Sequence, residues 1–350
     1  MILKQLKLTN FRNYSNLSLD FDQRSTILLG NNAVGKSNLL EAIYFLSTSK
    51  SSRTALELEL IKKGETFATV EGQIEDDSHF SLQLQINMQL LGEYRKKVSV
   101  NRLSRRVVDY LGNFPAVMFS PVDINMVIGA PSLRRWHLDL SLAQVDAHYK
   151  KALTLYEQYL VNRNRVLKRI REGLSRADEL TFWTGELIKQ GEIISSARAA
   201  FLESLNSFQA LGNFRFAYQQ SLITQERLRE YSTREIAVAS TLIGPHRDDF
   251  TVEMGERNLA HFGSRGEQRM ATLAFKLATL EYMSLTLGKR PILLLDDVFS
   301  ELDASHRAAV VEIVSRQQTI MATVELENIP QEFLDSARIL KIEDGVIKGL

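Results

Sequence analysis

Residues 30–37 read Gly30-Asn31-Asn32-Ala33-Val34-Gly35-Lys36-Ser37, which is the phosphate-binding pattern G-x-x-x-x-G-K-S. The apolar run 26–29 before this loop predicts a strand, and residues 38–46 after it are compatible with a helix. In that setting the glycines let backbone N–H groups turn inward, and the helix adds its positive end. Lys36 is then expected to reach the β- and γ-phosphates of a nucleotide, and Ser37 to offer its hydroxyl to Mg²⁺. The alternative is a chance match in an ordinary loop, against which the flanking strand and helix argue.

The composition is that of an ordinary globular protein and names no function. Of 350 residues, 44% are hydrophobic and 24% are charged, which suits one large or two modest domains. There are 43 basic and 42 acidic residues, a formal net charge of +1, so a nucleic-acid surface would have to be a local patch. The sequence has no cysteine, which excludes disulfides, thiolate zinc sites and a cysteine nucleophile. Since no apolar run approaches the ~18 residues of a membrane span and no signal-peptide core follows Met1, we expect a cytoplasmic protein.

The pattern of apolar residues changes along the chain. Alternation predicts strands within residues 6–21 and an antiparallel sheet over residues 65–110. From Tyr149 a 4-3 apolar spacing predicts one long helix, interrupted at Arg163 where an apolar residue is due. Intervals of seven predict a second helix through Leu180, Leu187, Ile194, Phe201 and Phe208. The two helices form either a short antiparallel arm or core helices of a globular lobe, and the sequence favours neither.

Residues 292–297 are predicted to supply the second half of the nucleotide site. Residues 292–295 form an apolar run typical of a strand buried on both faces of a parallel sheet. Asp296 and Asp297 follow at its C-terminal end, where open α/β sheets bind ligands. Asp296 is expected to hold Mg²⁺ beside Ser37, and Asp297 to orient the attacking water or accept its proton. The alternative is that the two carboxylates only cap a following helix.

Several motifs together resemble a known family. Phe11-Arg12-Asn13, residues 30–37 and the segment LLLDDVFSELD (residues 293–303) look like the ATP-binding-cassette heads of chromosome-maintenance and recombination proteins. Ser264-Arg265-Gly266-Glu267-Gln268-Arg269 resembles the signature motif of such heads. The similarity narrows to the RecF family of bacterial recombination mediators on three further matches: Pro121-Val122-Asp123 followed by residues 129–131 and 134–139, Gly244-Pro245-His246-Arg247-Asp248-Asp249, and the spacing from Lys36 to Asp296.

The resemblance implies an α/β fold. An ATP-binding-cassette head, with a mixed sheet and a flanking antiparallel β-subdomain, is expected at residues 1–118 and 241–350. A helical lobe with a short helical-hairpin arm is expected at residues 119–240. The implied cofactors are ATP and Mg²⁺, and the resemblance adds Arg12, Asn13 and Arg53 to the cofactor-binding residues. For Arg53 a surface loop is an equally good interpretation.

The resemblance also implies a function. In an ATP-driven homodimer, Ser264 and Gly266 of one subunit would close over the γ-phosphate held by Lys36 of the other, unless they merely cap a helix. The dimer would clamp duplex, gapped or junction DNA, with RecR and RecO as mediator partners and the recombinase RecA loaded as the result. Its ATPase would be weak and stimulated by DNA. Gly263 and Glu267 depart from the usual signature and residues 319–324 lack the His of transporter cassettes, which bears on the hydrolysis rate more than on binding.

DNA contacts are predicted in two basic clusters, which on sequence alone are equally well explained as solvated faces. The clusters comprise Arg95, Lys96, Lys97, Arg102, Arg105 and Arg106, and then Arg163, Arg165, Lys168, Arg169 and Arg171. For Arg134 and Arg135 the sequence leaves phosphate contacts open and favours structural ion pairs. Competing functions are the ATPase subunit of a transporter, another SMC-like head with no mediator role, and a P-loop kinase. The distant signature-like and acidic segments disfavour a kinase, which needs neither.

Overall fold

The structure is a computed structural model that describes residues 1–23, 25–76, 80–208, 211–299, 302, 304–343 and 346–349. The chain forms two compact units. The first comprises Met1–Asp123 and Leu273–Leu350, and the second comprises Ile124–Thr272. Buried hydrophobic side chains occur in both, so each unit has a core of its own.

The first unit contains an antiparallel sheet with the strand order β2-β1-β4-β5-β6-β7. Its strands are β1 (Ile2–Phe11), β2 (Tyr14–Asp20), β4 (Phe67–Glu75), β5 (Ser81–Leu91), β6 (Glu93–Val100) and β7 (Leu103–Arg105). Alternate residues such as Leu6 and Leu8 are buried, because successive side chains of a strand point to opposite faces. The predicted antiparallel sheet within residues 65–110 is confirmed.

A second sheet of this unit positions the phosphate-binding loop, and its order is β15-β14-β3-β13-β12-β8. Its strands are β3 (Thr26–Leu29), β8 (Ala116–Phe119), β12 (Ile292–Asp296), β13 (Thr319–Thr323), β14 (Arg338–Glu343) and β15 (Val346–Gly349). Neighbouring strands are parallel except β14 and β15. Every residue of β12 is buried, as expected of a strand covered on both faces, so the predicted strand at residues 292–295 is confirmed.

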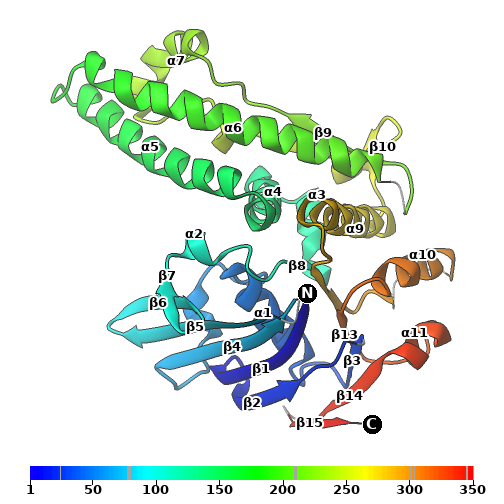
Figure 1. Cartoon of the computed structure of the whole chain (residues 1–350). Coiled ribbons are helices and arrows are strands. Elements are labelled where there is room, and N and C mark those ends of the chain that lie inside the picture. The colour runs from blue at the N-terminus through cyan, green and yellow to red at the C-terminus, as the bar shows by residue number, and fades with distance from the viewer. Residues whose placement is uncertain are drawn as a thin grey trace. The chain divides into compact units, whose positions relative to one another are not determined.

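Helix α1 (Lys36–Thr48) follows the phosphate-binding loop and contacts strands of both sheets, so it lies between them (Figure 1). Leu39, Ile43 and Phe45 on this helix are 0% exposed and stand at the centre of the core. The smaller elements of the unit are η1 (Glu57–Leu60), α2 (Val107–Tyr110), η2 (Pro121–Ile124, which ends in the second unit), α10 (Ala304–Val314) and α11 (Gln331–Ser336). The buried helix therefore fixes the loop rigidly.

The second unit is mainly helical. Its helices are α3 (Asn125–Ile128), α4 (Pro131–Val145), α5 (Ala147–Arg171), η3 (Ala177–Glu179), α6 (Leu180–Ser207), α7 (Gln225–Val238), η4 (Pro245–Arg247) and α8 (Leu259–Phe262). A small sheet has the order β11-β10-β9, from β9 (Phe214–Gln219), β10 (Asp249–Met254) and β11 (Arg257–Asn258). Helix α9 (Arg265–Leu287) begins in this unit and ends in the first.

The two predicted long helices are α5 and α6, which lie side by side in Figure 1. Leu187, Ile194 and Phe201, from the predicted series of sevens, are 0% exposed. The pair also contacts α4, α7 and β9, so much of it belongs to the core of the unit. Within the described ranges, no helix combines the length and the apolar character that crossing a membrane would need.

The unit boundaries differ from the predicted domain bounds. The units divide after Asp123 and after Thr272, whereas the sequence placed the second boundary at residues 240–241. The reason is that β10 pairs with β9 and contacts α4, so residues 249–254 pack with the helical unit. No local pattern in residues 241–272 predicts the pairing of β10 with β9.

Candidate nucleotide-binding site

The lysine of the phosphate-binding loop is held by the loop itself. Lys36 Nζ donates hydrogen bonds to the carbonyl oxygens of Gly30 at 2.7 Å and Asn31 at 2.8 Å. Gly35 has a φ of +113°, which favours glycine, and a Cβ at this position would lie 2.5 Å from the nearest side-chain atom. Tyr14 donates to the Gly35 carbonyl oxygen at 3.1 Å, and burial raises the pKa of its phenol to about 12. The loop backbone is thus fixed from both sides.

Asp296 meets the loop from the end of β12. Ser37 Oγ donates to Asp296 Oδ1 at 3.0 Å, although the two residues are 259 positions apart. The contact forms because β3 and β12 flank β13 in parallel, so their carboxyl ends share one edge of the sheet. Burial raises the pKa of Asp296, while the Ser37 hydrogen bond and the charge of Arg53 lower it. The Ser37 hydroxyl and an Asp296 carboxylate oxygen therefore lie close together. Such a pair suits Mg²⁺, which prefers oxygen ligands.

Asp297 follows with a left-handed backbone conformation. Its φ is +52°, which is unfavourable for a residue other than glycine and recurs at functional sites. Its N–H donates to the carbonyl oxygen of Ala322 at 3.0 Å, which fixes Asp297 beside the end of β13. Helix α10 begins only at Ala304, so neither Asp296 nor Asp297 is its N-cap. The last part of the LLLDDVFSELD segment, Ser300, Glu301 and Asp303, lies outside the described residues.

A cavity of about 270 Å³ lies against the loop. The predicted residues that line it are Asn32, Ala33, Gly35, Lys36, Ser37, Arg53, Asp296 and Asp297. Gly30, Asn31 and Val34 line a neighbouring cavity of about 440 Å³ beside β14. Asn38 and Thr323 also line the first cavity. The sequence did not single out Asn38, although its place directly after Ser37 on the first turn of α1 was a usable signal.

Asn13 and Arg53 contact the loop and its helix. Asn13 Nδ2 donates to the Val34 carbonyl oxygen at 3.4 Å, and its Oδ1 accepts from Asn38 Nδ2 at 2.8 Å. Arg53 Nη1 donates to Asn38 Oδ1 at 3.0 Å, and Arg53 lines the cavity itself. Asn38 therefore links the two predicted residues to α1.

Arg12 is engaged elsewhere. Its guanidinium donates to the buried carboxylate of Glu41, with Nε–Oε2 at 3.0 Å and Nη2–Oε1 at 2.9 Å. Its Nη1 donates to the Glu59 carbonyl oxygen at 3.0 Å. Arg12 lines a separate cavity of about 750 Å³, together with Asn13 and Arg53. The donors of Arg12 are thus directed at protein acceptors beside the loop.

Ser264 and Gly266 belong to the second unit, at the exposed beginning of α9. A reciprocal capping box is formed there: the Glu267 N–H donates to Ser264 Oγ at 3.2 Å, and the Ser264 N–H donates to Glu267 Oε2 at 2.7 Å. Arg257 donates to Glu267 Oε1 at 2.8 Å. These hydrogen bonds to its carboxylate lower the pKa of Glu267. The departure from the usual signature at Glu267 therefore stabilises the start of the helix.

Two of the predicted DNA contacts are wrong. The side chain of Lys96 is only 13% exposed, and its Nζ lies 2.6 Å from Glu57 Oε2. The side chain of Arg163 is 3% exposed, and its Nη2 lies 2.6 Å from Glu235 Oε2. Both cations are paired with carboxylates distant in sequence, and Arg163 is buried while Lys96 is half-buried, so neither belongs to the exposed cationic surface. The other members of the clusters are exposed, namely Arg95, Lys97, Arg102, Arg105, Arg106, Arg165, Lys168, Arg169 and Arg171.

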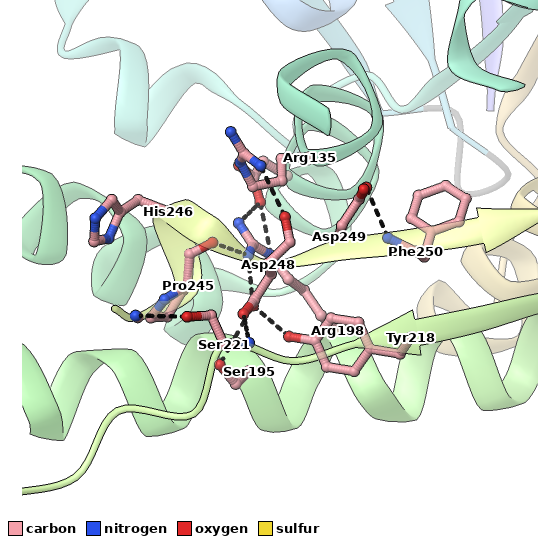
Figure 2. A network of polar contacts seen from close by, with 12 residues as sticks. Arg135, Ser195, Arg198, Tyr218, Ser221, Pro245, His246, Asp248, Asp249 and Phe250 are labelled. Carbon is pink, nitrogen blue, oxygen red and sulfur yellow. Dashed lines mark hydrogen bonds and ion pairs between the residues drawn. The ribbon is translucent and has the colours of Figure 1, made fainter. Parts of the chain in front are cut away.

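The segment Gly244–Asp249 lies at a buried polar network in the helical unit. Figure 2 shows Arg198, Tyr218 and Ser221 around Asp248, which is 0% exposed. Arg198 Nη1 donates to Asp248 Oδ2 at 2.9 Å, the Ser221 N–H donates to Asp248 Oδ1 at 2.7 Å, and the Tyr218 hydroxyl donates to the same carboxylate. The network joins α6, β9 and the segment before β10, which stabilises the unit.

Arg134, Arg135 and His246 also have structural contacts. Arg134 forms a bidentate pair with Asp249, with Nε–Oδ1 at 2.6 Å and Nη2–Oδ2 at 2.9 Å, which confirms its interpretation as an ion-pair former. Arg135 Nη1 donates to the Asp248 carbonyl oxygen at 2.8 Å. His246 Nδ1 lies 2.7 Å from the Tyr156 hydroxyl, and burial lowers the pKa of His246 to about 4.

The site and fold can be compared with those of known proteins. The DNA replication and repair protein RecF of Oceanobacillus iheyensis is 36% identical over 372 residues, covering 99% of this chain and 100% of that protein. The chain belongs to the RecF family. A RecF of Bacillus thuringiensis is 34% identical over 373 residues, covering 99% of this chain and 98% of that protein. The RecF/RecN/SMC N-terminal domain family matches residues 2–345.

Solved structures agree with this membership. The recombination mediator protein RecF-ATP of the RecFOR pathway has a TM-score of 0.90 and 30% identity, covering 99% of this chain and 97% of that one. The corresponding RecF-ATPrS structure has a TM-score of 0.87 at 30% identity, covering 100% and 98%. An Smc head of Pyrococcus furiosus, 17% identical over 99% of this chain and 95% of that one with a TM-score of 0.53, shares the fold. The predicted fold class, an α/β ATP-binding-cassette head, is confirmed, and the RecF family is one of DNA replication and repair proteins.

Proposed function

We propose that the chain is an ATP-dependent DNA-binding protein that hydrolyses ATP slowly and acts in recombinational repair and replication restart. The observation that carries this proposal is the 3.0 Å hydrogen bond between Ser37 and Asp296 beside Lys36, which gathers a cation, a hydroxyl and a carboxylate at one cavity. The similarity to the RecF-ATP structure supports ATP as the nucleotide.

Lys36 would supply the main charge that holds the phosphates. Its two present acceptors, the carbonyls of Gly30 and Asn31, are neutral, whereas phosphate oxygens are charged and accept stronger hydrogen bonds. Phosphates entering the cavity would therefore draw the ammonium away from the carbonyls. Burial lowers the pKa of Lys36, and the carboxylates of Asp296 and Asp297 oppose that shift, so the groups that flank the phosphates also favour the charged ammonium.

Ser37 and Asp296 would hold Mg²⁺, because their oxygens face each other and Mg²⁺ binds proteins through few oxygens together with phosphates and water. When bound, the ion neutralises charge that develops on the β- and γ-phosphates. Asp297 would orient the attacking water, since it lines the same cavity with its backbone fixed to β13. Arg53, on the cavity wall, would stabilise negative charge on the transferred phosphoryl group.

The proposed active form is an ATP-dependent homodimer, in which Ser264 and Gly266 of one copy contact the γ-phosphate held by Lys36 of a second copy. Two observations support this role for the start of α9. Ser264 and Gly266 are both exposed, and a Cβ built on Gly266 meets no atom within 4 Å, which leaves room for a ligand. The helix N-terminus also offers N–H donors and a partial positive charge.

Exposed cations would bind DNA through its phosphates. After Lys96 and Arg163 are removed from the predicted clusters, exposed arginines and lysines remain on β6 and β7 and along α5. Contacts of this kind position duplex or gapped DNA without reading its sequence, and they weaken as salt rises. We propose RecR and RecO as mediator partners and RecA as the recombinase whose loading results, which the RecFOR pathway of the similar solved structures supports.

ATP turnover with and without duplex DNA tests the catalytic part of this proposal. We expect a rate below the typical enzyme value of about ten per second, raised by DNA and lost in Lys36→Ala. Turnover that is indifferent to DNA would contradict the DNA-dependent function. Full turnover in Lys36→Ala would overturn the nucleotide site as a whole.

Light scattering tests the dimer. With ATP and Mg²⁺ above the nucleotide affinity, the mass should rise from one copy to two, and Gly266→Glu should prevent the rise by placing a negative charge beside the phosphate. Leu285→Glu, which adds the same charge at a 72% exposed position far along α9, serves as the control. An unchanged mass with wild-type protein would refute the dimer while leaving ATP binding in place.

A further inference from the structure

Glu41 is a fully buried carboxylate on α1 to which the proposed reaction assigns no role. It lies about one helical turn beyond Ser37, and its side chain is 0% exposed. It accepts hydrogen bonds from Arg12 Nε at 3.0 Å, from Arg12 Nη2 at 2.9 Å and from Ser51 Oγ at 2.6 Å. Both oxygens are therefore engaged and the charge is balanced by a bidentate arginine, which is what a buried ion requires.

Ser51 connects this carboxylate to the turn that carries Arg53. The Ser51 hydroxyl, which donates to Glu41, also accepts from the backbone N–H groups of Arg53 and Thr54, each at 3.0 Å. Ser51 is only 8% exposed, so water competes little for these bonds. Because the single O–H proton is committed to the carboxylate, the oxygen lone pairs are directed at the turn. One hydroxyl thus ties the backbone of the turn to α1.

The guanidinium of Arg53 is attached to the same helix. Its Nη1 donates to Asn38 Oδ1 at 3.0 Å, and Asn38 lies about one turn before Glu41 on the same face of α1. Arg53 lines the phosphate cavity together with Lys36 and Asp296. An exposed arginine otherwise samples many rotamers, so these two attachments select the position at the cavity.

We propose that Glu41 is a positioning residue for ATP hydrolysis, which acts through Ser51 to hold Arg53 at the phosphate cavity and does not touch the nucleotide. The inference rests on the proposed ATPase function and assigns the support of one of its groups. Arg12 then serves as the counter-ion of Glu41, in agreement with its additional bond to the Glu59 carbonyl oxygen. Helix α1 thereby supplies Lys36 and Ser37 from its first turn, and it orients the arginine through Asn38 on the first turn and Glu41 on the second.

Glu41→Gln is the first test, because it keeps the size of the side chain and removes its charge. A glutamine has one acceptor oxygen and one donor group, so it cannot reproduce all three bonds of the carboxylate. If its oxygen replaces Oε1, its NH₂ group faces the Arg12 Nε donor, and if its oxygen replaces Oε2, Ser51 and Arg12 Nη2 lose their acceptor. We expect kcat to fall about 10- to 100-fold with KM for ATP little changed, since Lys36 and the loop amides remain. A merely structural role would instead lower the amount of folded protein and leave kcat per folded molecule unchanged.

Glu281→Gln is the matched control. Glu281 is 7% exposed and accepts from Arg290 Nη2 at 3.1 Å, so the substitution also breaks a bidentate arginine pair with a buried carboxylate in the same unit. Glu281 does not line the phosphate cavity, and its partner Arg290 does not either. We therefore expect a comparable loss of stability and a wild-type kcat.

Ser51→Ala separates positioning from folding, since it leaves the Arg12–Glu41 pair intact and removes only the link to the turn. We expect folded protein with reduced kcat. In the Arg53→Ala background, Ser51→Ala should cause no further loss, because the group it positions is gone.

The wild-type assay distinguishes the two possible failures. If wild type neither binds nor hydrolyses ATP, the proposed function fails and this inference fails with it. If wild type turns over ATP and Ser51→Ala has the kcat of Glu281→Gln, the positioning role is refuted and the ATPase function stands. Independent, multiplying losses from Ser51→Ala and Arg53→Ala would also refute it, since the hydroxyl would then act by another route.

Discussion

Arg163 offers a sharp test of how charge is used in the helical unit. It stands on α5 at a position where the apolar repeat requires a hydrophobic residue, and its side chain is 3% exposed. Its guanidinium donates to Glu235 Oε2 at 2.6 Å, to Thr241 Oγ1 at 2.7 Å and to Thr184 Oγ1 at 3.2 Å. Glu235 is 0% exposed, so each charge depends on the other. Arg163→Met keeps the bulk of the side chain and removes the charge.

The expected loss of stability follows from the contacts that Glu235 keeps in the variant. In Arg163→Met its carboxylate retains the Leu242 N–H at 2.9 Å as a donor but loses its counter-ion. Removing one partner of a buried ion pair costs about 3–5 kcal/mol. For a unit of this size, each kcal/mol lowers the melting temperature by about 2–4 °C, so the expected fall is about 6–20 °C. Arg163→Met/Glu235→Gln should recover a large part, because the amide oxygen can still accept from Leu242 without a buried charge.

Two assays decide the matter. Urea and thermal unfolding should rank wild type above the double variant and the double variant above Arg163→Met. The second assay is the slope of the logarithm of the DNA-binding constant against the logarithm of salt concentration, measured where all variants are folded. This slope should be unchanged in Arg163→Met, and in Lys168→Met its magnitude should fall by about 0.9 if Lys168 contacts one phosphate. A near-wild-type melting temperature for Arg163→Met, or a double variant less stable than the single one, would refute the reasoning.

Three further outcomes are expected. Lys36→Ala should weaken ATP binding by about 1.5–3 kcal/mol in calorimetry on the folded variant, the value of a hydrogen bond to a charged group. Gly35→Ala should cost about 1–3 kcal/mol of stability in urea unfolding and also weaken ATP binding, because of its φ of +113° and the 2.5 Å approach of a Cβ to Asn13; a neutral effect would contradict that geometry. Burial lowers the pKa of His246 to about 4, so only the unfolded chain takes up this proton as pH falls from about 6.5 toward 4. Stability should be full above pH 6.5 and drop by on the order of 2–3 kcal/mol by pH 4, and this part of the drop should disappear in His246→Gln when urea midpoints are compared.

Local patterns explain why much of the first unit could be predicted. The loop at residues 30–37 needs a strand before it and a helix after it, and both are encoded by adjacent residues. Likewise, the apolar residues of β12 predict a strand covered on both faces, which places Asp296 at the carboxyl edge of the sheet. Short-range sequence and the rules of parallel sheets were therefore sufficient to bring Ser37 and Asp296 together.

The failures concern partners that are distant in sequence. In the sequence, Lys96 and Arg163 belong to basic clusters because the carboxylates that pair with them are far away along the chain. Glu57 lies 39 residues from Lys96, and Glu235 lies 72 residues from Arg163. A signal was available for Arg163, since a cation at an apolar position of a heptad is costly unless it is paired. No such signal exists for Lys96, which lies on a strand where exposed and half-buried positions alternate. Charge counted along the chain thus overestimates the cationic surface.

The sequence leaves the role of Arg53 open, and the contacts that hold this residue in the structure make its role interpretable. A lone arginine in the polar segment after α1 is compatible with a surface loop or a phosphate contact, and nothing nearby distinguishes the two. The structure supplies two attachments, from Ser51 to the backbone of its turn and from Asn38 to its guanidinium. Both lead back to α1, whose start is set by the phosphate-binding loop itself. An element fixed by a local motif can therefore orient a residue that the motif does not contain, and the position of Arg53 at the cavity is a consequence of the same helix that presents Lys36.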